Sequence, residues 1–404
     1  MIVGGGPAGL TAAAELAGQI DGPVLVIERE MATGGIPRHS DHLGYGLRDL
    51  RRFISGPAYA RRLTSMARDV GAVLETQAMV TGWAGDRRLE VTAPSGRRVV
   101  TAGAVVLATG ARERPRAARL IPGDRPDGVL TTGELQNLVH LSHADVGSRA
   151  VVIGAELVSW SAVLTLREAR CDTVAMTTES ARSEAYAAFR LAGRRLLRGP
   201  LLTRARVVAI EGRERVSAVV VTHLDSGQRS RIECDTVITT GDWVSESELA
   251  RLAGITVDEA TGGPLVDGGL GTTGFGVFAA GNQLHPVDTA DGAALDGRRV
   301  AASVATWLRS PAPARSGARI WVTPPLRWVA PQLVVRDEVG PRQQLSLWVD
   351  EYRRFPKLRA TQRGRVLREA RVAWPAAPGR VFRAPWSLVA DADPDGGDIT
   401  LELR

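Results

Sequence analysis

The chain has 404 residues, of which 44% are hydrophobic and 24% charged, and these globular values exclude global disorder, collagen and coiled coil. Its net charge of +7 comes from scattered arginines, with Lys357 the only lysine, so we expect no nucleic-acid partner. The sequence contains no run of about 18 apolar residues, so we expect no membrane span. Two cysteines are too few for a disulfide framework or a four-thiolate metal site. We therefore expect a cytoplasmic chain without a metal.

The chain begins with a strand, a glycine turn, a helix over about residues 8–17 and a second strand that ends at residue 28. The same order returns in residues 149–176. Two such βαβ units predict an α/β protein with two Rossmann-like dinucleotide-binding domains, each built on a parallel sheet. Because only three residues precede the first turn, we expect either that the true start lies upstream or that this strand is at the edge of its sheet.

The first turn, GGGPAG, places Gly4, Gly6 and Gly9 in the spacing GxGxxG, and Glu28 follows 19 residues after Gly9. In a dinucleotide site the first glycine permits the tight turn, the second lets a pyrophosphate approach the backbone, and the third lets the helix pack on the strand. The helix N terminus stabilises the phosphates, and the acidic side chain accepts hydrogen bonds from ribose hydroxyls. The spacing therefore predicts a bound dinucleotide.

Further along the chain, buried strands end in glycine turns within residues 105–115, 236–243 and 275–282. The first two of these turns are alike, which predicts that the chain crosses between its two domains there. A helix is expected over residues 289–308. We therefore assign residues 1–110 and 241–308 to one discontinuous dinucleotide-binding domain and residues 111–240 to the second.

A linker rich in proline and small residues is predicted over residues 309–317. The residues after it form short alternating stretches with aromatic side chains, separated by proline and glycine, and such stretches are typical of strands and turns. Five of the nine tryptophans fall in this part. We predict a small all-β sandwich over residues 318–404 that is separable from the rest and takes no direct part in the chemistry.

Taken together, GGGPAG with Glu28, the pair Gly34–Gly35, LATGARERP and GVFAAGN resemble the two-dinucleotide-domain flavoproteins of the pyridine nucleotide-disulfide oxidoreductase type, over roughly residues 1–308. The resemblance implies that FAD occupies the first turn. Family members carry an aspartate after Gly281, whereas this chain has Asn282, whose amide can still hydrogen-bond a ribityl hydroxyl. The FAD contacts that the resemblance implies are Gly4, Gly6, Pro7, Ala8, Gly9, Glu28, Arg29, Gly34, Gly35, Ile36, Met79, Val80, Ala108, Thr109, Gly110, Gly281 and Asn282.

The second glycine turn departs from the family pattern, because only Gly154 of its three glycines is present. Glu156 replaces the glycine that would approach a pyrophosphate, and Ser159 replaces the third. Like charges about 4 Å apart repel by roughly 1–4 kcal/mol. We therefore expect that NAD(P) does not bind and that this βαβ unit is a scaffold, with nucleotide binding in a shifted pose as the alternative.

Disulfide reductases of the family pair two cysteines beside the flavin, but the stretch after Gly35 contains none. Cys171 and Cys234 form no redox motif and are interpreted as small buried hydrophobic residues. Disulfide reduction is therefore not expected.

Candidate bases follow the two segments that the resemblance brings to the flavin. His285 and Asp288 come shortly after Gly281, and His42 follows Gly35. Because imidazole titrates near neutral pH, we predict His285 as the base, Asp288 as the residue that orients it, and His42 as the next candidate. The alternatives are structural: His285 packs beneath the C-terminal domain, Asp288 caps the following helix, and His42 is an exposed loop residue.

We predict an FAD-dependent oxidoreductase that oxidises a small organic substrate and passes the electrons to oxygen, a quinone or a partner protein. Two alternatives stay open: an NAD(P)H-dependent flavin reductase of the same fold, and a non-catalytic flavoprotein subunit of a larger dehydrogenase. The chain also resembles the flavin subunits of multi-subunit amine, opine and cyanide-forming dehydrogenases, but it lacks their additional cysteine module. A partner subunit bound through the C-terminal β-domain and a homo-oligomer both stay open.

Overall fold

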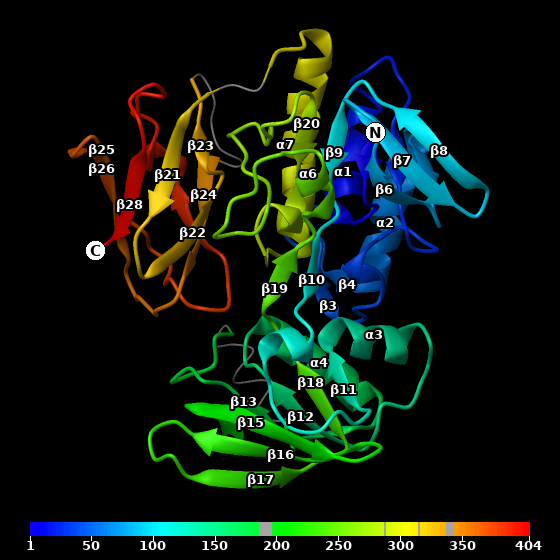
Figure 1. Cartoon of the computed structure of the whole chain (residues 1–404), viewed down its shortest axis with the longest axis vertical. Helices are drawn as coiled ribbons and strands as arrows, with labels where there is room; N and C mark the ends of the chain where they lie inside the picture. Colours follow the sequence, from blue (N-terminus) through cyan, green and yellow to red (C-terminus); the bar gives the residue numbers. More distant parts are fainter. Residues whose placement is uncertain (186–195, 287, 314–315, 337–342) are drawn as a thin grey trace. The chain divides into compact units, whose positions relative to one another are not determined.

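The computed structural model describes residues 1–404 apart from 186–195, 287, 314–315 and 337–342, so part of the predicted linker lies outside the described residues. The chain folds into two compact units, and each is assembled from segments that are far apart in the sequence. The first contains residues 1–38, 44–111 and 245–404, and the second contains residues 39–43 and 112–244. Apart from the short segment 39–43, the chain passes between the units within β10 (Ala111–Glu113) and β19 (Trp243–Ser245), which pair with each other (Figure 1).

The first unit is built on a five-stranded parallel sheet in the order β20-β9-β1-β2-β5. Its strands are β1 (Ile2–Val3), β2 (Leu25–Ile27), β5 (Val73–Glu75), β9 (Val105–Leu107) and β20 (Val277–Ala279). β1 pairs with β2 on one side and with β9 on the other, so the short first strand lies in the middle of the sheet. The predicted edge position is therefore wrong. Although β1 is short, pairing with a neighbouring strand on each side holds it in the sheet.

Three long helices accompany this sheet: α1 (Pro7–Leu16), α2 (Gly56–Asp69) and α7 (Ala290–Arg309). α1 and α7 start within one residue of the predicted helices. α1 is rich in alanine, and α7 approaches it so closely that a Cβ on Gly297 would lie 2.3 Å from the backbone oxygen of Ala8. Small residues on both helices therefore permit this close contact.

Short elements complete this part of the unit. They are η1 (Ile36–Arg38), β3 (Leu43–Tyr45), β4 (Ile54–Ser55), the antiparallel sheet of β6 (Met79–Trp83), β7 (Arg88–Ala93) and β8 (Gly96–Thr101), the helix α6 (Glu248–Leu252) and η3 (Gly281–Gln283).

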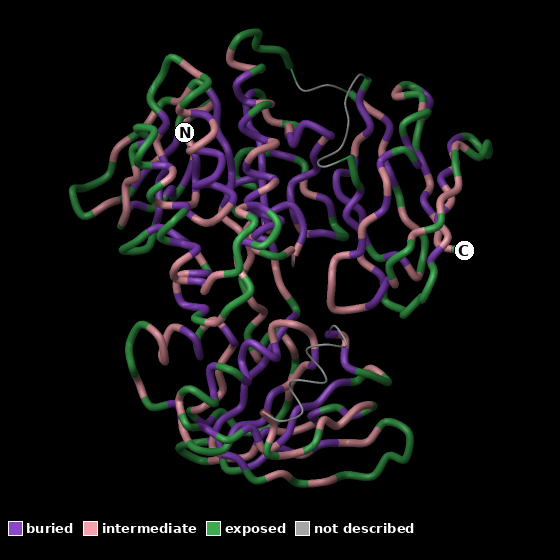
Figure 2. Tube along the Cα trace, turned by 180° about the vertical axis from the view of Figure 1, so that it is seen from behind, coloured by how far each residue is buried: buried purple, intermediate pink, exposed green. Residues whose placement is uncertain are grey.

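The second unit repeats the parallel arrangement, with the strand order β11-β18-β12-β13-β14. Helices and an antiparallel sheet cover opposite faces, and their buried residues are purple in Figure 2. These two sheets and the helices confirm the second Rossmann-like domain. Its elements are η2 (Arg116–Arg119), β11 (Val129–Thr131), α3 (Thr132–His140), β12 (Arg149–Ile153), α4 (Leu157–Glu168), β13 (Asp172–Thr177), β14 (Leu201–Leu202), β15 (Ala205–Gly212), β16 (Val216–His223), β17 (Arg229–Glu233) and β18 (Thr236–Thr239).

The C-terminal residues form two sheets, ordered β23-β21-β28-β25-β26 and β22-β24-β27, around a shared apolar core. This confirms the all-β sandwich. The same compact unit also contains the first parallel sheet. That the sandwich is separable from it stays a prediction. The elements are β21 (Ala318–Val322), β22 (Leu326–Ala330), β23 (Leu333–Val334), β24 (Gln344–Val349), β25 (Lys357–Gln362), β26 (Arg365–Arg371), β27 (Phe382–Pro385), η5 (Trp386–Leu388) and β28 (Ile399–Leu403).

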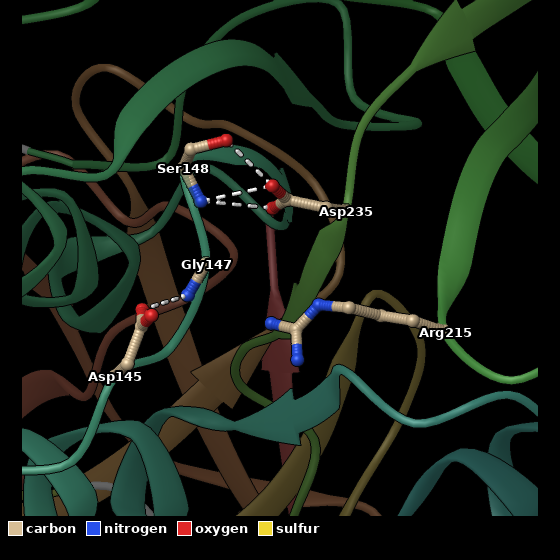
Figure 3. A pocket seen from close by; sticks show the side chains of 5 residues that line it. All are labelled: Asp145, Gly147, Ser148, Arg215 and Asp235. Atoms are coloured by element: carbon tan, nitrogen blue, oxygen red, sulfur yellow. Dashed lines mark hydrogen bonds between the residues drawn. The ribbon is translucent and has the colours of Figure 1, made fainter.

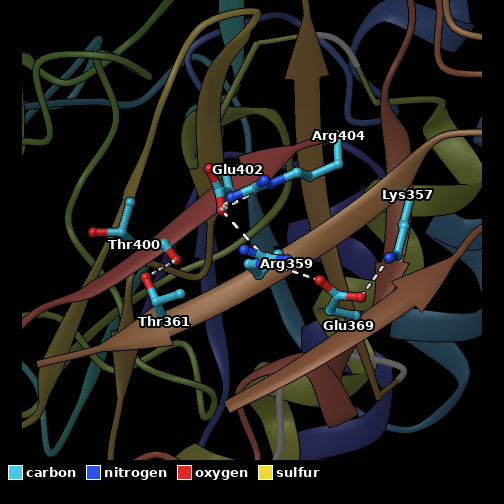
Figure 4. Close-up of polar contacts among 7 residues, drawn as sticks. All are labelled: Lys357, Arg359, Thr361, Glu369, Thr400, Glu402 and Arg404. Carbon is cyan, nitrogen blue, oxygen red and sulfur yellow. Dashed lines mark hydrogen bonds and ion pairs between the residues drawn. The ribbon is translucent and has the colours of Figure 1, made fainter. Parts of the chain in front are cut away.

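One face of the five-stranded C-terminal sheet carries opposite charges across β25, β26 and β28 (Figure 4). Arg359 donates to Glu369 at 2.6 Å, Lys357 pairs with the same carboxylate, and Arg404 donates to Glu402 at 2.7 Å. These side chains are partly exposed, and exposed pairs contribute little to stability. Their effect is to keep this face polar, which leaves the opposite face to form the core.

α7 is the longest described helix, with 20 residues, but charged side chains interrupt it. None of the helices that the structure describes is long and apolar enough to cross a membrane.

Candidate functional site

The first glycine turn needs two of its glycines for its own folding. Gly4 has a φ of +107°, and a Cβ on it would lie 2.4 Å from the backbone oxygen of Ala108. A Cβ on Gly9 would lie 1.9 Å from the backbone oxygen of Gly4. Both contacts are shorter than any real carbon–oxygen contact, so a side chain at either position would displace the turn.

Gly6 is different, because the protein itself does not require a glycine there. A Cβ on Gly6 would have only the Cα of Gly35 as a neighbour, 4.0 Å away, and its φ of −81° suits any residue. Gly6 is also the N-cap of α1, whose first turn contains no acidic residue. The open space therefore lies at a helix N terminus, where an anionic group is stabilised.

Glu28 stands beside the same turn at the end of β2 and is buried. Its Oε2 accepts a hydrogen bond from the Gly5 N–H and its Oε1 accepts one from the Glu30 N–H, both at 2.8 Å. Each carboxylate oxygen can accept a second bond, as a ribose would require. The Ala78 N–H donates to the backbone oxygen of Glu28 at 3.0 Å, which brings the start of β6 next to this acid.

Four of the predicted contacts lie in these neighbouring segments. Gly34 donates its N–H to the backbone oxygen of Gly5 at 2.7 Å, and a Cβ on Gly35 would come within 3.0 Å of Gly6. Met79 and Val80 open β6, the first exposed and the second buried. The structure thus gathers segments 4–9, 28–36 and 78–80 around one turn.

Gln283 is a candidate site residue that the sequence pattern did not indicate. It is fully buried, and its Oε1 accepts a hydrogen bond from the Thr109 N–H at 3.4 Å, within the predicted turn 108–110. Its Nε2 makes no hydrogen bond with any of the described residues. An unsatisfied buried amide costs about 1–3 kcal/mol, so a ligand acceptor at this place would be stabilising. Its position two residues after Gly281 was the only signal in the sequence.

Gly281 and Asn282 follow β20. Gly281 has a φ of +74°, and a Cβ on it would lie 2.8 Å from the Cβ of Ala8, where the starts of α1 and α7 meet. Asn282 closes the next loop: its Oδ1 accepts from the Asp288 N–H at 2.9 Å and its Nδ2 donates to the Asp288 backbone oxygen at 3.2 Å. An aspartate could not donate the second bond, which explains the amide at this position.

These observations fit FAD. The open space at Gly6, the acid at Glu28 and the orphaned amide of Gln283 supply places for a diphosphate, a ribose and a hydrogen-bond acceptor, respectively.

The candidate catalytic residues fall in different surroundings. His285 is 2% exposed, and its ring stacks on Trp328 with centroids 4.7 Å apart. Oxygen atoms of Asp288 accept hydrogen bonds from Arg383 and from the Thr289 N–H. His42 belongs to the other compact unit, where its ring contacts Ser40 and the Leu43 backbone oxygen, and burial lowers its pKa. Their catalytic roles stay predictions.

In the second unit, the carboxylate of Glu156 folds into the second glycine turn. A Cβ on Gly154 would lie 2.8 Å from Oε2 of Glu156, and one on Gly241 would lie 2.7 Å from Oε1. Ser159, at the third glycine position, hydrogen-bonds Thr240 at 2.7 Å. The turn is therefore filled by its own side chains.

A second segment covers the same turn. The Ser183 hydroxyl donates to the backbone oxygen of Ala155 at 2.6 Å, and the Ala185 N–H donates to the same oxygen at 3.3 Å. Arg119 lies close by and donates to the backbone oxygens of Thr240 and Gly241. The backbone oxygens of Ala155, Thr240 and Gly241 beside this turn thus accept hydrogen bonds from other groups of the protein.

We expect Glu156→Gln to stabilise the protein at pH 8 and to leave it unchanged near pH 4. Burial raises the pKa of Glu156, and its Oε1 has no hydrogen-bond partner among the described residues. Because the folded-state pKa is raised, the stability linked to this group is present below the unfolded pKa and is lost as pH rises through the folded value. Thermal unfolding at both pH values measures this; equal midpoints for variant and wild type at pH 8 would contradict it.

A shallow hollow of about 540 Å³ lies at the opposite ends of the second unit's strands (Figure 3). Ser148 donates to Asp235 at 2.6 Å, and Arg215 donates to the Val146 backbone oxygen at 2.7 Å. Burial opposes ionisation of Asp235, but hydrogen bonds from Ser148 and Arg149 outweigh it and lower its pKa to about 2. These polar groups bind one another, so the hollow is a structural feature rather than a second site.

The part of the chain that contains the first glycine turn is similar in sequence to known proteins. The profile of the pyridine nucleotide-disulphide oxidoreductase family matches residues 1–297. Sarcosine oxidase subunit alpha from Corynebacterium sp. (strain P-1) is 28% identical over 274 residues, which cover 60% of this chain and 26% of that protein. The chain therefore spans about a quarter of the length of this curated relative.

Solved structures share the fold. Thioredoxin reductase from T. acidophilum is similar with a TM-score of 0.65 at 20% identity, covering 76% of this chain and 98% of that one. A NAD-dependent persulfide reductase from A. fulgidus is similar with a TM-score of 0.59 at 19% identity, covering 92% of this chain and 69% of that one. At these identities the likeness is one of fold.

Proposed function

Because the chain belongs to the pyridine nucleotide-disulphide oxidoreductase family, whose members are FAD-dependent oxidoreductases, we propose that it oxidises a small organic substrate and passes the electrons to oxygen, a quinone or a partner protein. FAD, when bound, supplies the two-electron chemistry. The observation that carries the proposal is the contrast between the two turns: Gly6 leaves open space, whereas Glu156 fills the corresponding place. One site is thus suited to FAD and the other disfavours NAD(P)H.

The cysteines support an activity other than disulfide reduction. Cys171 and Cys234 are both buried, and burial raises the pKa of each thiol to about 12. A thiol must ionise to attack a disulfide, so both stay unreactive at neutral pH.

The proposed FAD contacts are those gathered around the first turn, with Gln283 added. Gly6 and the N terminus of α1 would hold the diphosphate, and Glu28 would accept hydrogen bonds from the adenosine ribose. Met79 and Val80 would lie at the adenine, while Thr109 and Gln283 would lie at the flavin end. His285 is retained as the first candidate base and His42 as the second.

A subunit role is the second candidate, because the curated relative is a subunit by its printed name. In that role this chain would hold FAD and a partner chain would supply the rest of the substrate site. The C-terminal β-domain is then one candidate for the partner contact, and self-association is another. Secondary amines such as sarcosine become the first substrates to test.

We expect the purified full-length chain to be yellow, with about one FAD per chain, and its flavin to be bleached anaerobically by a small substrate. The screen should contain sarcosine and other secondary amino acids, with absorbance near 450 nm as the readout (about the usual flavin maximum). A chain that holds no FAD and takes up none when FAD is added would overturn the proposal. Bleaching only after a partner chain is supplied would favour the subunit role.

A further inference from the structure

The C-terminal β-sandwich contacts the loop that follows the predicted FAD strand. This loop covers residues 282–289, of which 287 lies outside the described residues. Arg383 on β27 places Nη2 2.7 Å from Oδ1 of Asp288 and in contact with Oδ2 as well. The Asp288 side chain is 3% exposed and that of Arg383 is 19% exposed, so this ion pair is largely buried. A buried carboxylate depends strongly on its partner, because loss of the cation leaves an uncompensated charge.

Asp288 in turn fixes two groups at the predicted site. Its backbone N–H and C=O hold the side chain of Asn282, as described above. Its carboxylate accepts the Thr289 N–H at 2.7 Å and lies 2.3 Å from the place of a Cβ on Gly292, in the first turn of α7. A displacement of Asp288 would therefore move Asn282 and the start of α7 together.

A second contact reaches the same loop from β22. Trp328 is 3% exposed and stacks on His285; it also stacks on Trp348, with the centroids of the two tryptophan rings 5.9 Å apart. A cavity of about 10 Å³ remains between His285 and Ser346 of β24, which is about the space of one water molecule. The sheet and the loop are thus closely packed.

Two further contacts join the sandwich to the same compact unit. Gln332 exchanges hydrogen bonds with Val266, through the Gln332 N–H at 3.1 Å and the side-chain Oε1 at 3.2 Å. Arg319 donates to the buried Asp258 at 2.9 Å. The sandwich is therefore held at several points and does not depend on the loop for its attachment.

We propose that the three-stranded C-terminal sheet is a structural part of the flavin site, in which Arg383 and Trp328 are positioning residues for the loop 282–289. The inference rests on the proposed FAD site. It differs from the expectation that the sandwich takes no part, because Arg383, 95 positions after Asp288, and Trp328 both contact the loop that follows Gly281.

The test measures FAD affinity and the flavin absorption spectrum of full-length variants. Arg383→Met keeps the unbranched apolar stem of the side chain but removes its charged end, and we expect FAD to bind about tenfold more weakly or worse, with a shifted spectrum. Arg383→Lys restores a cation and should recover part of both. Arg368→Met is the matched control, because Arg368 pairs with Asp391 at 2.8 Å in the same domain but both side chains are exposed.

Wild-type affinity and spectrum in Arg383→Met would overturn the inference. If that variant does not fold, the double variant Asp288→Asn with Arg383→Gln removes both charges together, and the same two measurements decide. Failure of the wild type to bind FAD would instead overturn the proposed function. A loss in Arg368→Met equal to that in Arg383→Met would also contradict the inference, since any surface charge would then have the same effect.

Discussion

Gly6→Val is expected to fold like the wild type and to lose FAD. A Cβ at this position meets no protein atom closer than the Gly35 Cα at 4.0 Å, and the φ of −81° accepts a branched residue. The valine methyl groups would occupy the space proposed for the diphosphate, next to the N terminus of α1. We expect the affinity for FAD to fall about 100-fold or more, which corresponds to roughly 2.7 kcal/mol.

Two other glycines provide controls for that result. Gly9→Val should destabilise the protein with or without FAD, because its Cβ would lie 1.9 Å from the Gly4 oxygen. Gly18→Val should change neither property, because nothing lies within 4 Å of its Cβ position. Thermal unfolding and an FAD titration separate the three cases. Stoichiometric FAD in Gly6→Val would show that the diphosphate lies elsewhere.

Neither NADH nor NADPH is expected to reduce the bound flavin at a rate near that of the substrate. The carboxylate of Glu156 lies within the second turn, and Ser183 and Ala185 hydrogen-bond the Ala155 oxygen beside it. When Glu156 is ionised, repulsion of roughly 1–4 kcal/mol against a diphosphate lowers affinity about fivefold to nearly a thousandfold, before the loss of space is counted. Anaerobic stopped-flow mixing with each nucleotide measures the rate.

Two substitutions separate charge from space at this turn. Glu156→Gln removes the charge and keeps the volume, whereas Glu156→Gly removes both. We expect binding of NADH or NADPH to improve in Glu156→Gly by about tenfold and less in Glu156→Gln. Rapid bleaching of the wild type by either nucleotide would favour the NAD(P)H-dependent reductase instead.

The parts of this protein that the sequence predicts are those that depend on neighbouring residues. The first turn, the helix after it and the position of Glu28 beside the turn could be predicted from the glycine spacing. All three depend on backbone torsion angles and helix geometry within about 30 residues. The same reasoning identified the second βαβ unit and its damaged turn. Alternation of apolar and polar residues predicted the C-terminal strands, since the two faces of a strand meet different surroundings.

The tertiary structure decided what depends on side chains distant in the sequence. The place of β1 in the middle of its sheet depends on β9, about a hundred residues downstream. The orphaned amide of Gln283 and the ion pair of Asp288 with Arg383 likewise depend on packing between segments that no local pattern relates. Sequence spacing restricts backbone torsion angles, but it does not specify where a side chain meets a partner on another element. For this reason the sequence indicated where FAD would bind, while only the folded chain showed that the C-terminal sheet packs against the loop beside it.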